Sequence, residues 1–297
     1  MSHFCVLVVS TINDDIDEIL EPYNENRRVD RYVSQTKAEV IKLAIDRREE
    51  YKNGRYAEFL ADPIKYEDGC TNPGHIEFIK VTFPKLLEMN DEELYQDEIK
   101  YYEPSDIGPD GEIYSTYNPN SKWDWYEVGG RYAGMLRVKE GTPFHEPNFS
   151  WDIEHDEQEK VIADFGTDVA VVGTVDFTKI HRTEESYTAS LRYWELMVEG
   201  AKPKTEDENE MVSHSFYTPE FYIERYGNKE TYAKCQSSFS TWAVLMDGAW
   251  YEKGSMGMFA LSDETHDEAI DWEMNYYDRF IKNLPEKSIL TIVDCHI

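Results

Sequence analysis

Both ends of the chain are short runs of apolar, β-branched residues. The first run is "HFCVLVVS", residues 3–10, and the second is "SILTIVDCHI", which closes the 297-residue sequence. Such runs are typical of strands that are buried on both faces. A chain that begins and ends in buried-type strands is expected to pair its ends in or near one sheet, and this pairing would tie down both termini.

Helical patterns fill much of the sequence between these runs. Thr36 and Glu39 have the spacing of a capping box, and Pro73 stands in the first turn of a second helix, where proline is tolerated. The stretch "KPKTEDENE", residues 202–210, has no apolar residue and is expected to be a linker or mobile loop. The predicted helices span residues 37–51, 73–89, 91–102, 184–199 and 264–283, with two short pieces after Pro219.

The strand patterns complete an α+β prediction. We expect a mixed sheet built from the N-terminal strand, the strand "AGMLRVK" after "GGR", the "TWAVLM" hairpin and the C-terminal strand, with "MGMFAL" as a further strand. Helices from residues 36–102 are expected to cover one side. The expected division is 1–140 as an N-terminal α+β part, 141–240 as an inserted lobe or arm, and 241–297 completing the sheet.

The charge is extreme for a chain of this size. Sixty Asp and Glu residues against thirty Lys and Arg residues give a formal net charge of −30. Such a field disfavours direct binding to nucleic acid or an anionic membrane, and it attracts basic surfaces over a Debye length of about 8–10 Å. The four cysteines form no CxxC pair, and no signal sequence or membrane span is evident, so we expect a reduced, cytoplasmic protein.

Two acidic segments are candidate partner-binding surfaces. Between residues 88 and 112 there are ten acids and one base, and a second row recurs every four residues on the helix predicted near the C-terminus. Carboxylates on neighbouring turns could imitate the charge array of DNA or steer association with a basic surface, although charge runs on helices are usually solvated faces. The candidate residues are Asp91, Glu92, Glu93, Asp97, Glu98, Asp263, Asp267 and Asp271.

The terminal strands also carry side chains that can act in catalysis or bind a metal ion. If the two strands are neighbours, a period of two places His3 and Cys5 on one face of the first strand, and Asp294 and His296 on one face of the last. A set of Cys5, Asp294 and His296 could act as a nucleophile cluster or a metal site. The alternative is that these side chains fill a sheet face with their hydrogen bonds satisfied, because the register cannot be read from the sequence.

The stretch "SKWDWYEVGGRYAG", residues 121–134, is the densest motif. It matches no nucleotide-binding, zinc-binding or nucleophile-elbow signature. Its side chains could pack a corner of the core around a bulged strand, with Arg131 on a buried or half-buried carboxylate, or they could form a protein-binding patch or a small-ligand pocket. The candidate binding residues are Trp123, Trp125, Tyr126, Arg131 and Tyr132.

Four stretches together carry a family resemblance. "MSHFCVLVV", "YSTYNPNSKWDWYEVGGRYAG", "WYEKGSMGMF" and "LTIVDCHI" resemble a family of proteins of similar length encoded by phages and prophages, mostly without an assigned activity. Tyr132 and Met135 depart from the bulkier aromatics expected after "GGR". In size and character the chain is similar to Gabija anti-defence proteins, which implies an inhibitor that encases a nuclease complex and blocks its access to DNA. The family supplies no catalytic residues.

These observations favour a non-enzymatic, acidic inhibitor of a host defence or nucleic-acid-processing complex with a basic surface. The competing hypothesis is a small hydrolase or ligand-binding enzyme that uses the cluster near the paired termini. No cofactor and no metal are expected. Twenty-one tyrosines and seven tryptophans exceed what the core needs, which favours a homo-oligomer because these residues are enriched at interfaces.

Overall fold

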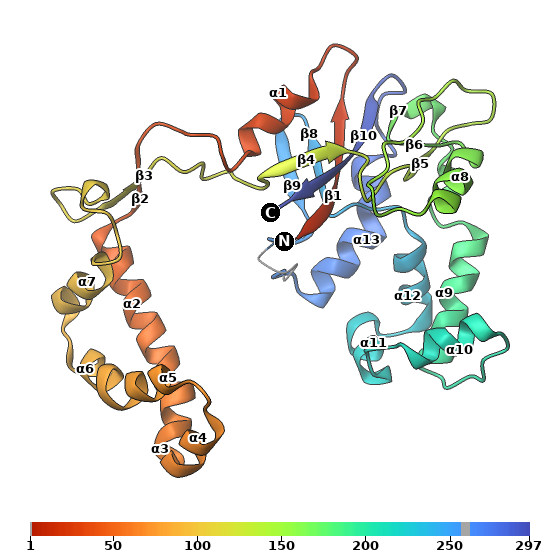
Figure 1. Cartoon of the computed structure of the whole chain (residues 1–297). Coiled ribbons are helices and arrows are strands. Elements are labelled where there is room, and N and C mark those ends of the chain that lie inside the picture. The colour runs from red at the N-terminus through yellow and green to blue at the C-terminus, as the bar shows by residue number, and fades with distance from the viewer. Residues whose placement is uncertain (1, 257–261) are drawn as a thin grey trace. The chain divides into compact units, whose positions relative to one another are not determined.

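The computed structural model describes residues 2–256 and 262–297 (Figure 1). The fold is α+β, as predicted, and the chain forms two compact units. The first unit contains Met1–Arg27 and Pro119–Ile297, and the second contains Arg28–Asn118. Each unit has its own core and is described by itself below.

The first unit is organised by a mixed sheet that holds both ends of the chain. The strand order is β4-β10-β1-β8-β9, and β7 also pairs with β10. β1 and β10 are antiparallel along their whole length, so the predicted pairing of the termini is confirmed. The strands are β1 (His3–Ser10), β4 (Trp125–Val128), β7 (Val169–Val171), β8 (Ala243–Met246), β9 (Ala249–Glu252) and β10 (Ile289–His296).

The two faces of this sheet are both buried in their middle. On one face Leu7 and Ile292 pack against Trp272, Tyr276 and Phe280 of the long helix α13 (His266–Phe280), which lies along the sheet in Figure 1. On the other face the core residues include Val6, Val293, Leu20 and Trp123, and the short helix α1 (Ile16–Leu20) contributes to this layer. Burial on both faces explains why the first and last strands are continuous apolar runs.

The hairpin predicted near the C-terminus is confirmed. β8 and β9 pair antiparallel and are joined by Asp247 and Gly248, which both have positive φ angles of 54° and 72°. Two consecutive positive φ angles are typical of a type I′ turn, whose twist matches that of the flanking strands. The predicted strand "MGMFAL" falls almost entirely on residues 257–261 and lies outside the described residues.

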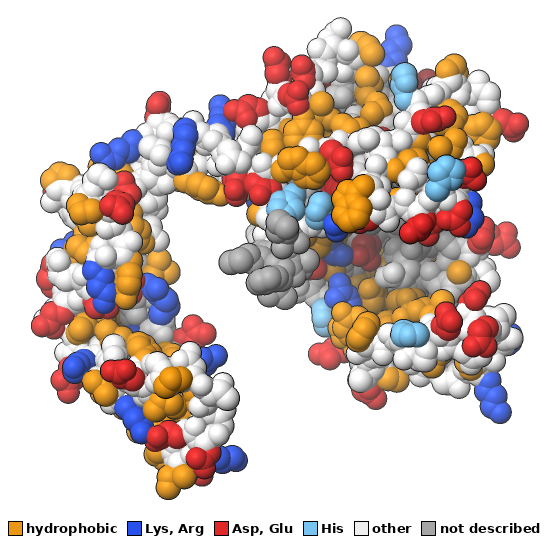
Figure 2. Space-filling model, in the orientation of Figure 1, with side chains coloured by type: hydrophobic (Ala, Val, Ile, Leu, Met, Phe, Trp, Pro, Cys, Tyr) orange, Lys and Arg blue, Asp and Glu red, His pale blue; other side chains and the backbone are white. Residues whose placement is uncertain are grey.

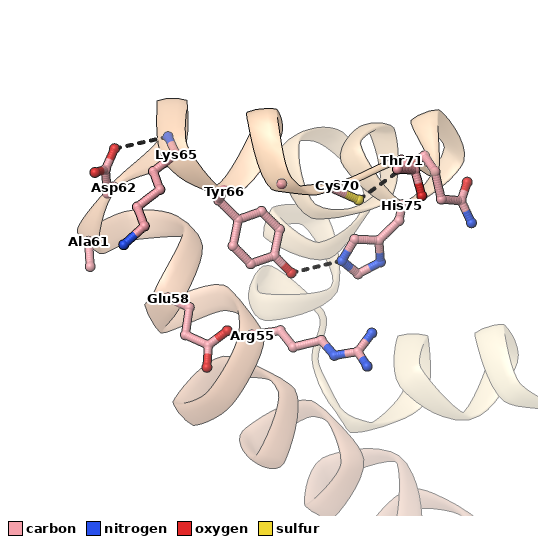
Figure 3. A pocket seen from close by; sticks show the side chains of 11 residues that line it. Arg55, Glu58, Ala61, Asp62, Lys65, Tyr66, Cys70, Thr71 and His75 are labelled. Carbon is pink, nitrogen blue, oxygen red and sulfur yellow. Dashed lines mark hydrogen bonds between the residues drawn. The ribbon is translucent and has the colours of Figure 1, made fainter.

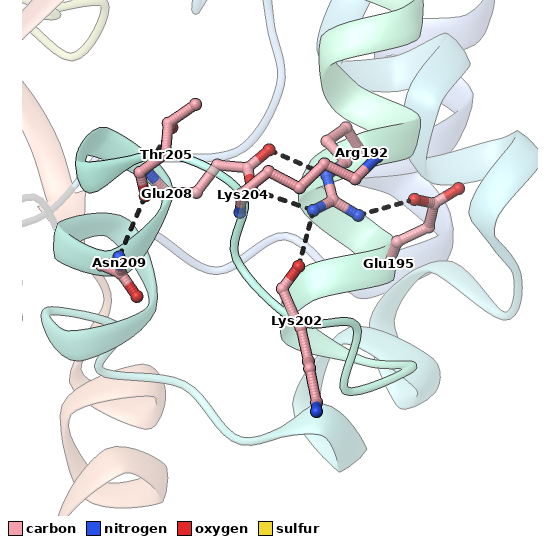
Figure 4. A network of polar contacts seen from close by, with 7 residues as sticks. All are labelled: Arg192, Glu195, Lys202, Lys204, Thr205, Glu208 and Asn209. Carbon is pink, nitrogen blue, oxygen red and sulfur yellow. Dashed lines mark hydrogen bonds and ion pairs between the residues drawn. The ribbon is translucent and has the colours of Figure 1, made fainter.

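A helical lobe follows β7. It contains α9 (Glu184–Met197), α10 (Glu206–Ser213), α11 (Pro219–Tyr226) and α12 (Lys229–Ser237), and Gly227–Asn228 separate the last two as predicted. The linker predicted over 202–210 is wrong in its second half, because Glu206 begins α10 behind its N-cap Thr205. Arg192 on α9 donates hydrogen bonds to both side-chain oxygens of Glu208 and a further one to the Glu195 carboxylate, so ion pairs to another helix order a segment without apolar residues (Figure 4).

A smaller sheet and one helix lie in sequence between β4 and β7 of the main sheet. β5 (Leu136–Arg137) and β6 (Gly166–Thr167) form a two-stranded sheet, and α8 (His155–Ala163) lies between them in sequence. The strand after "GGR" was predicted in the main sheet, and this prediction is wrong: β4, the strand before "GGR", takes that place. The predicted bulge is also wrong, since β4 pairs with β10 residue for residue.

The second unit is mainly helical. Its core includes Val40 of helix α2 (Lys37–Tyr51) and Tyr95 of helix α7 (Asp91–Ile99), and Ile113 of strand β3 (Ile113–Ser115) packs with them. The predicted helices of residues 36–102 thus belong to a compact unit with a core of its own. Its elements are β2 (Tyr32–Gln35), α2 (Lys37–Tyr51), α3 (Ala57–Ala61), α4 (Pro63–Gly69), α5 (Pro73–Glu77), α6 (Phe83–Glu88), α7 (Asp91–Ile99) and β3 (Ile113–Ser115).

The capping box predicted at the start of α2 is confirmed. Thr36 accepts the backbone N–H of Glu39, and the Glu39 carboxylate accepts the backbone N–H of Thr36, which is the predicted capping box.

The compact units divide the chain at residues 27–28 and 118–119, not at 140 and 240. Within residues 141–240, Val175 and Phe239 pack in the cluster around Leu7, whereas Trp194, Tyr222 and Tyr232 form a separate apolar cluster in the helical lobe.

Candidate functional site

Two histidines meet at the end of the sheet where the chain termini lie. The register of β1 and β10 pairs His3 with His296. Ser2 and Ile297, one position further out, exchange both backbone hydrogen bonds, so His3 and His296 form a non-hydrogen-bonded pair, in which side chains lie closer together. Their ring centroids are 5.1 Å apart, and the planes are nearly perpendicular.

Asp294 holds the first imidazole from beneath. Its Oδ1 lies 2.9 Å from His3 Nδ1, and its Oδ2 accepts the backbone N–H of Arg131 at 3.0 Å. The Asp294 side chain is fully buried. A buried carboxylate with two hydrogen-bond donors is a fixed group, and here it sets the orientation of His3.

Asp124 holds the second imidazole in the same way. Its Oδ1 lies 2.6 Å from His296 Nδ1, and its backbone N–H donates to the carbonyl oxygen of His296. Both imidazoles therefore use Nδ1 toward a carboxylate. Because a carboxylate only accepts, the neutral rings carry their proton on Nδ1 and keep the lone pair on Nε2.

The glycine pair of the aromatic motif shapes this centre. Gly129 and Gly130 have φ angles of 81° and 61°, and a Cβ on Gly130 would lie 2.6 Å from Asp294 Oδ2. The turn thus brings the backbone N–H of Arg131 onto the carboxylate at a distance that only glycine permits. The same turn carries the Arg131 side chain to Asp152, with 3.8 Å between Nε and Oδ2.

A second buried carboxylate, that of Asp168, holds the backbone that follows the Gly129–Gly130 turn. Asp168 accepts the backbone N–H groups of Gly134 and Asn148, each at 2.6 Å. Burial raises the pKa of Asp168, and the two backbone hydrogen bonds act in the opposite direction. Asp124, Asp152 and Asp168 are not among the residues predicted for the site, because nothing in a single sequence marks a carboxylate that distant segments will bring to one place.

The aromatic motif is divided between core, sheet and surface. Trp123 is buried and donates from Nε1 to the Leu20 carbonyl oxygen, while the Tyr126 hydroxyl reaches Asp17. Trp125 is 49% exposed and meets His3 edge-on, with 6.3 Å between ring centroids. Tyr132 donates its hydroxyl hydrogen to the His3 carbonyl oxygen. The motif is therefore one structural corner around the histidines, and its aromatic side chains do not form a single patch.

The predicted set of Cys5, Asp294 and His296 shares one face of β1 and β10, but it is not a nucleophile cluster. Burial first, and then the nearby Cys295 and Asp294, raise the pKa of the Cys5 thiol well above its ordinary value. Its Sγ lies 3.5 Å from Met135 Sδ, and Asp294 binds His3 and not His296. The thiolate is the reactive form, so Cys5 as placed here does not serve as a nucleophile.

A cavity of about 370 Å³ opens beside His3. Cys5, Tyr132 and Trp272 form part of its wall, and Lys253 borders it with its ammonium 2.7 Å from Glu273 Oε1. The residues that surround the histidines and this cavity come from all four of the sequence stretches that carry the family resemblance: His3, Asp124 to Tyr132, Lys253 with Met256, and Asp294 with His296. These stretches are far apart in sequence, and the fold brings them to one place.

The acidic cluster of α7 is largely paired within its own unit. Glu92 binds Lys37 at 2.6 Å and Glu98 binds Arg47 at 2.6 Å, while Asp97 pairs with Lys100. Glu93 accepts the backbone N–H of Asn90 as the last member of a capping box. Asp91 is exposed and has no ion pair among the described residues. The array of free charges is therefore smaller than the sequence suggests.

The second acidic row is broken by the start of its helix. Asp263 precedes the N-cap Thr265 and accepts the backbone N–H of Ser255, so the prediction that it lies on the same helix as Asp267 and Asp271 is wrong. Asp271 binds Arg279 at 2.8 Å. Asp267 is exposed and forms no ion pair within the described part of the chain.

The helical unit contains a cavity of its own, of about 800 Å³ (Figure 3). Tyr66 and His75 lie next to each other in its lining and share a hydrogen bond, with 2.9 Å between the hydroxyl oxygen and Nε2. Arg55 and Lys65 stand among its lining residues together with Glu58 and Asp62, so cations and carboxylates are mixed. No single ligand charge is favoured by this lining.

Comparison with known proteins adds nothing to this geometry: no family model, no curated protein and no solved structure matches the chain. In residues 2–256 and 262–297, no group of three or more His, Cys, Asp or Glu side chains is arranged to hold a metal ion. No helix in this part of the chain combines the length and the apolar character that crossing a membrane requires.

Proposed function

We propose that the chain is a phage-encoded, acidic, non-enzymatic inhibitor that binds a bacterial anti-phage defence complex, with the Gabija nuclease complex as the first candidate, and blocks its access to DNA. The observation that carries the proposal is the combination of a net charge of −30 with large apolar side chains left exposed on both compact units. The resemblance of the four sequence stretches to a phage family supplies the biological setting, the cytoplasm of the host cell.

The exposed apolar residues supply candidate contact points. In the first unit Trp151 is 93% exposed and Phe216 is 95% exposed. In the helical unit Ile64 and Tyr101 are also largely exposed, and Figure 2 shows hydrophobic side chains at the surface of both parts. Aromatic side chains at the surface are typical of protein interfaces and supply most of the binding energy once they are desolvated. The same residues support homo-oligomer formation, which light scattering measures directly.

The charge acts through association kinetics in this proposal. Exposed carboxylates such as Asp91 and Asp267 steer the inhibitor toward a basic, DNA-binding surface, and screening by salt weakens this steering. Because many acids of α7 are paired internally, we favour steering over imitation of a continuous DNA charge array. The competing hydrolase hypothesis is weakened by the burial of the Cys5 thiol, which raises its pKa well above the ordinary value.

The test uses purified Gabija complex, duplex DNA substrate and the full chain. We expect inhibition of DNA cleavage, competition by excess duplex DNA, and weaker binding when salt rises from about 50 to 200 mM. Phe216→Ala and Trp151→Ala each test the apolar contact. Asp91→Asn with Asp267→Asn removes unpaired charges, and Glu92→Gln with Glu98→Gln is the matched control because these carboxylates are already paired.

The unpaired-charge variant is expected to slow association more than the control does, with no change in melting temperature. Absence of binding to this complex contradicts the Gabija assignment, and affinity capture from infected cells then identifies the target. Salt-insensitive binding that DNA does not compete contradicts the role of the acidic charge.

A further inference from the structure

We propose that His3 and His296 together bind a transition-metal ion of the Zn²⁺ class through their Nε2 atoms. The proposal is independent of the inhibitor function and rests on the geometry of the two imidazoles. His3 Nδ1 faces Asp294 at 2.9 Å and His296 Nδ1 faces Asp124 at 2.6 Å, so both Nε2 lone pairs remain for a ligand.

A carboxylate behind each imidazole is the usual arrangement of histidines that bind metals. The carboxylate fixes the tautomer and the ring orientation, and it makes Nε2 more basic. Here the two carboxylates come from different segments: Asp294 belongs to β10, and Asp124 immediately precedes β4. Packing at the ends of two inner strands does not require two histidines that are each oriented by a separate carboxylate.

The spacing of the two rings fits a shared ion. Two imidazoles bound through Nε2 at about 2.0–2.1 Å to one tetrahedral ion place their ring centroids about 5 Å apart. The centroids of His3 and His296 are 5.1 Å apart, with 72° between the ring planes. Both side chains are largely but not fully buried, at 19% and 14% exposure, which leaves access for an ion from solvent.

The local charge also favours a cation. Asp124 and Asp294 bind the two imidazoles, and Glu127 stands opposite Asp294 on β4. The nearby cations are themselves paired with carboxylates, Arg131 with Asp152 and Lys253 with Glu273. Glu127 pairs with Asp294 across the strands and therefore points to the same face. An excess of negative charge opposes an anionic ligand at the histidines and lowers the free energy of a divalent cation there.

The protein supplies only part of the coordination sphere of the proposed ion. Since no set of three metal-binding side chains is present in the described residues, the chain supplies two nitrogens and water completes the sphere. Two imidazoles select Zn²⁺, Ni²⁺ or Cu²⁺ over Mg²⁺ and Ca²⁺, which prefer oxygen ligands. The expected site is open and exchangeable, not a structural zinc site on which folding depends.

The experiment titrates ZnCl₂ into the untagged full chain by isothermal calorimetry, with MgCl₂ as the parallel titrant. We expect one saturable Zn²⁺ site and no Mg²⁺ binding. His296→Asn lowers the Zn²⁺ affinity at least about 10-fold, and Asp124→Asn lowers it by about 10–100-fold while leaving both imidazoles in place. His155→Asn is the control, since His155 is exposed and distant in sequence.

A spectroscopic measurement covers the case in which a variant fails to fold. In the unsubstituted chain, Zn²⁺ is expected to shift the Nε2 resonances of two histidines out of eight, in long-range ¹H–¹⁵N spectra. Absence of saturable Zn²⁺ binding up to about 1 mM, well above the dissociation constants of built zinc sites, overturns the proposal. An equal loss of affinity in His155→Asn and His296→Asn, or shifts at other histidines only, also overturns it.

Discussion

Asp294 Oδ2 accepts the backbone N–H of Arg131 at 3.0 Å, across 163 residues of sequence. This hydrogen bond joins the last strand to the glycine turn of the aromatic motif. The other oxygen of Asp294 holds His3, so one buried carboxylate connects the first strand, the last strand and the middle of the chain. The corner formed in this way is the structural reason for the density of the motif.

Asp294→Ala is expected to destabilise the first unit. It leaves the Nδ1–H of His3 and the backbone N–H of Arg131 without acceptors in a buried place, at a cost of about 3 kcal/mol. For a unit of this size that corresponds to a fall in melting temperature of roughly 6–12 °C. Asp278→Ala, an exposed carboxylate paired with Lys282, is the control. Equal melting temperatures for the two variants would show that Asp294 is not part of the core.

Gly130→Ala is expected to disrupt the same corner by a different route. The new Cβ would lie 2.6 Å from Asp294 Oδ2, and the residue would be held at a φ of 61°. Gly141→Ala is a matched control, because Gly141 has a φ of 80° but open space around it. Chemical denaturation should show about 1 kcal/mol lost in the control from backbone strain, and clearly more in Gly130→Ala. Similar losses would mean that the close approach to Asp294 carries no cost.

The thiols are expected to differ in reactivity. Burial raises the pKa of Cys5 well above its ordinary value and raises the pKa of Cys235 to about 12. Cys70 is partly exposed. Iodoacetamide at about pH 8 should therefore modify Cys70 in the native protein, with the other thiols reacting only after unfolding. Mass spectrometry of the modified peptides is the measurement, and rapid native modification of Cys5 would restore the nucleophile hypothesis.

The order of α10 is expected to depend on pH. The Arg192 side chain, and next the backbone N–H of Lys204, lower the pKa of Glu208 to about 2. A lowered pKa in the folded state means that the stabilisation is complete above the ordinary glutamate pKa of about 4.5 and is lost as the pH falls toward 2. The amide protection factors of Glu206–Ser213, corrected for the intrinsic exchange rate at each pH, should fall over that interval. Glu208→Gln should show low protection at all pH values, whereas Glu206→Gln should behave like the unsubstituted chain.

Local patterns predicted the elements well where local forces decide them. Thr36 and Glu39 cap α2 through bonds three residues apart, and the Asp247–Gly248 turn follows from residues that tolerate positive φ. The continuous apolar runs predicted β1 and β10, and their pairing, because a strand buried on both faces must lie inside a sheet. The linker prediction for 202–210 failed because Arg192, from another helix, neutralises and orders Glu208.

The sequence by itself determined that both ends are buried strands, that Thr36 begins a helix and that the chain is strongly acidic. Only the tertiary structure decided which residues face each other. A register shift of one residue would have moved His296 to the opposite face from His3. The sequence pattern of either strand alone does not determine this register. Asp124 reaches His296 across 172 residues, and Val40 of α2 and Tyr95 of α7 pack with Ile113 inside their own unit. These outcomes depend on packing between distant segments, whose energies no local pattern contains.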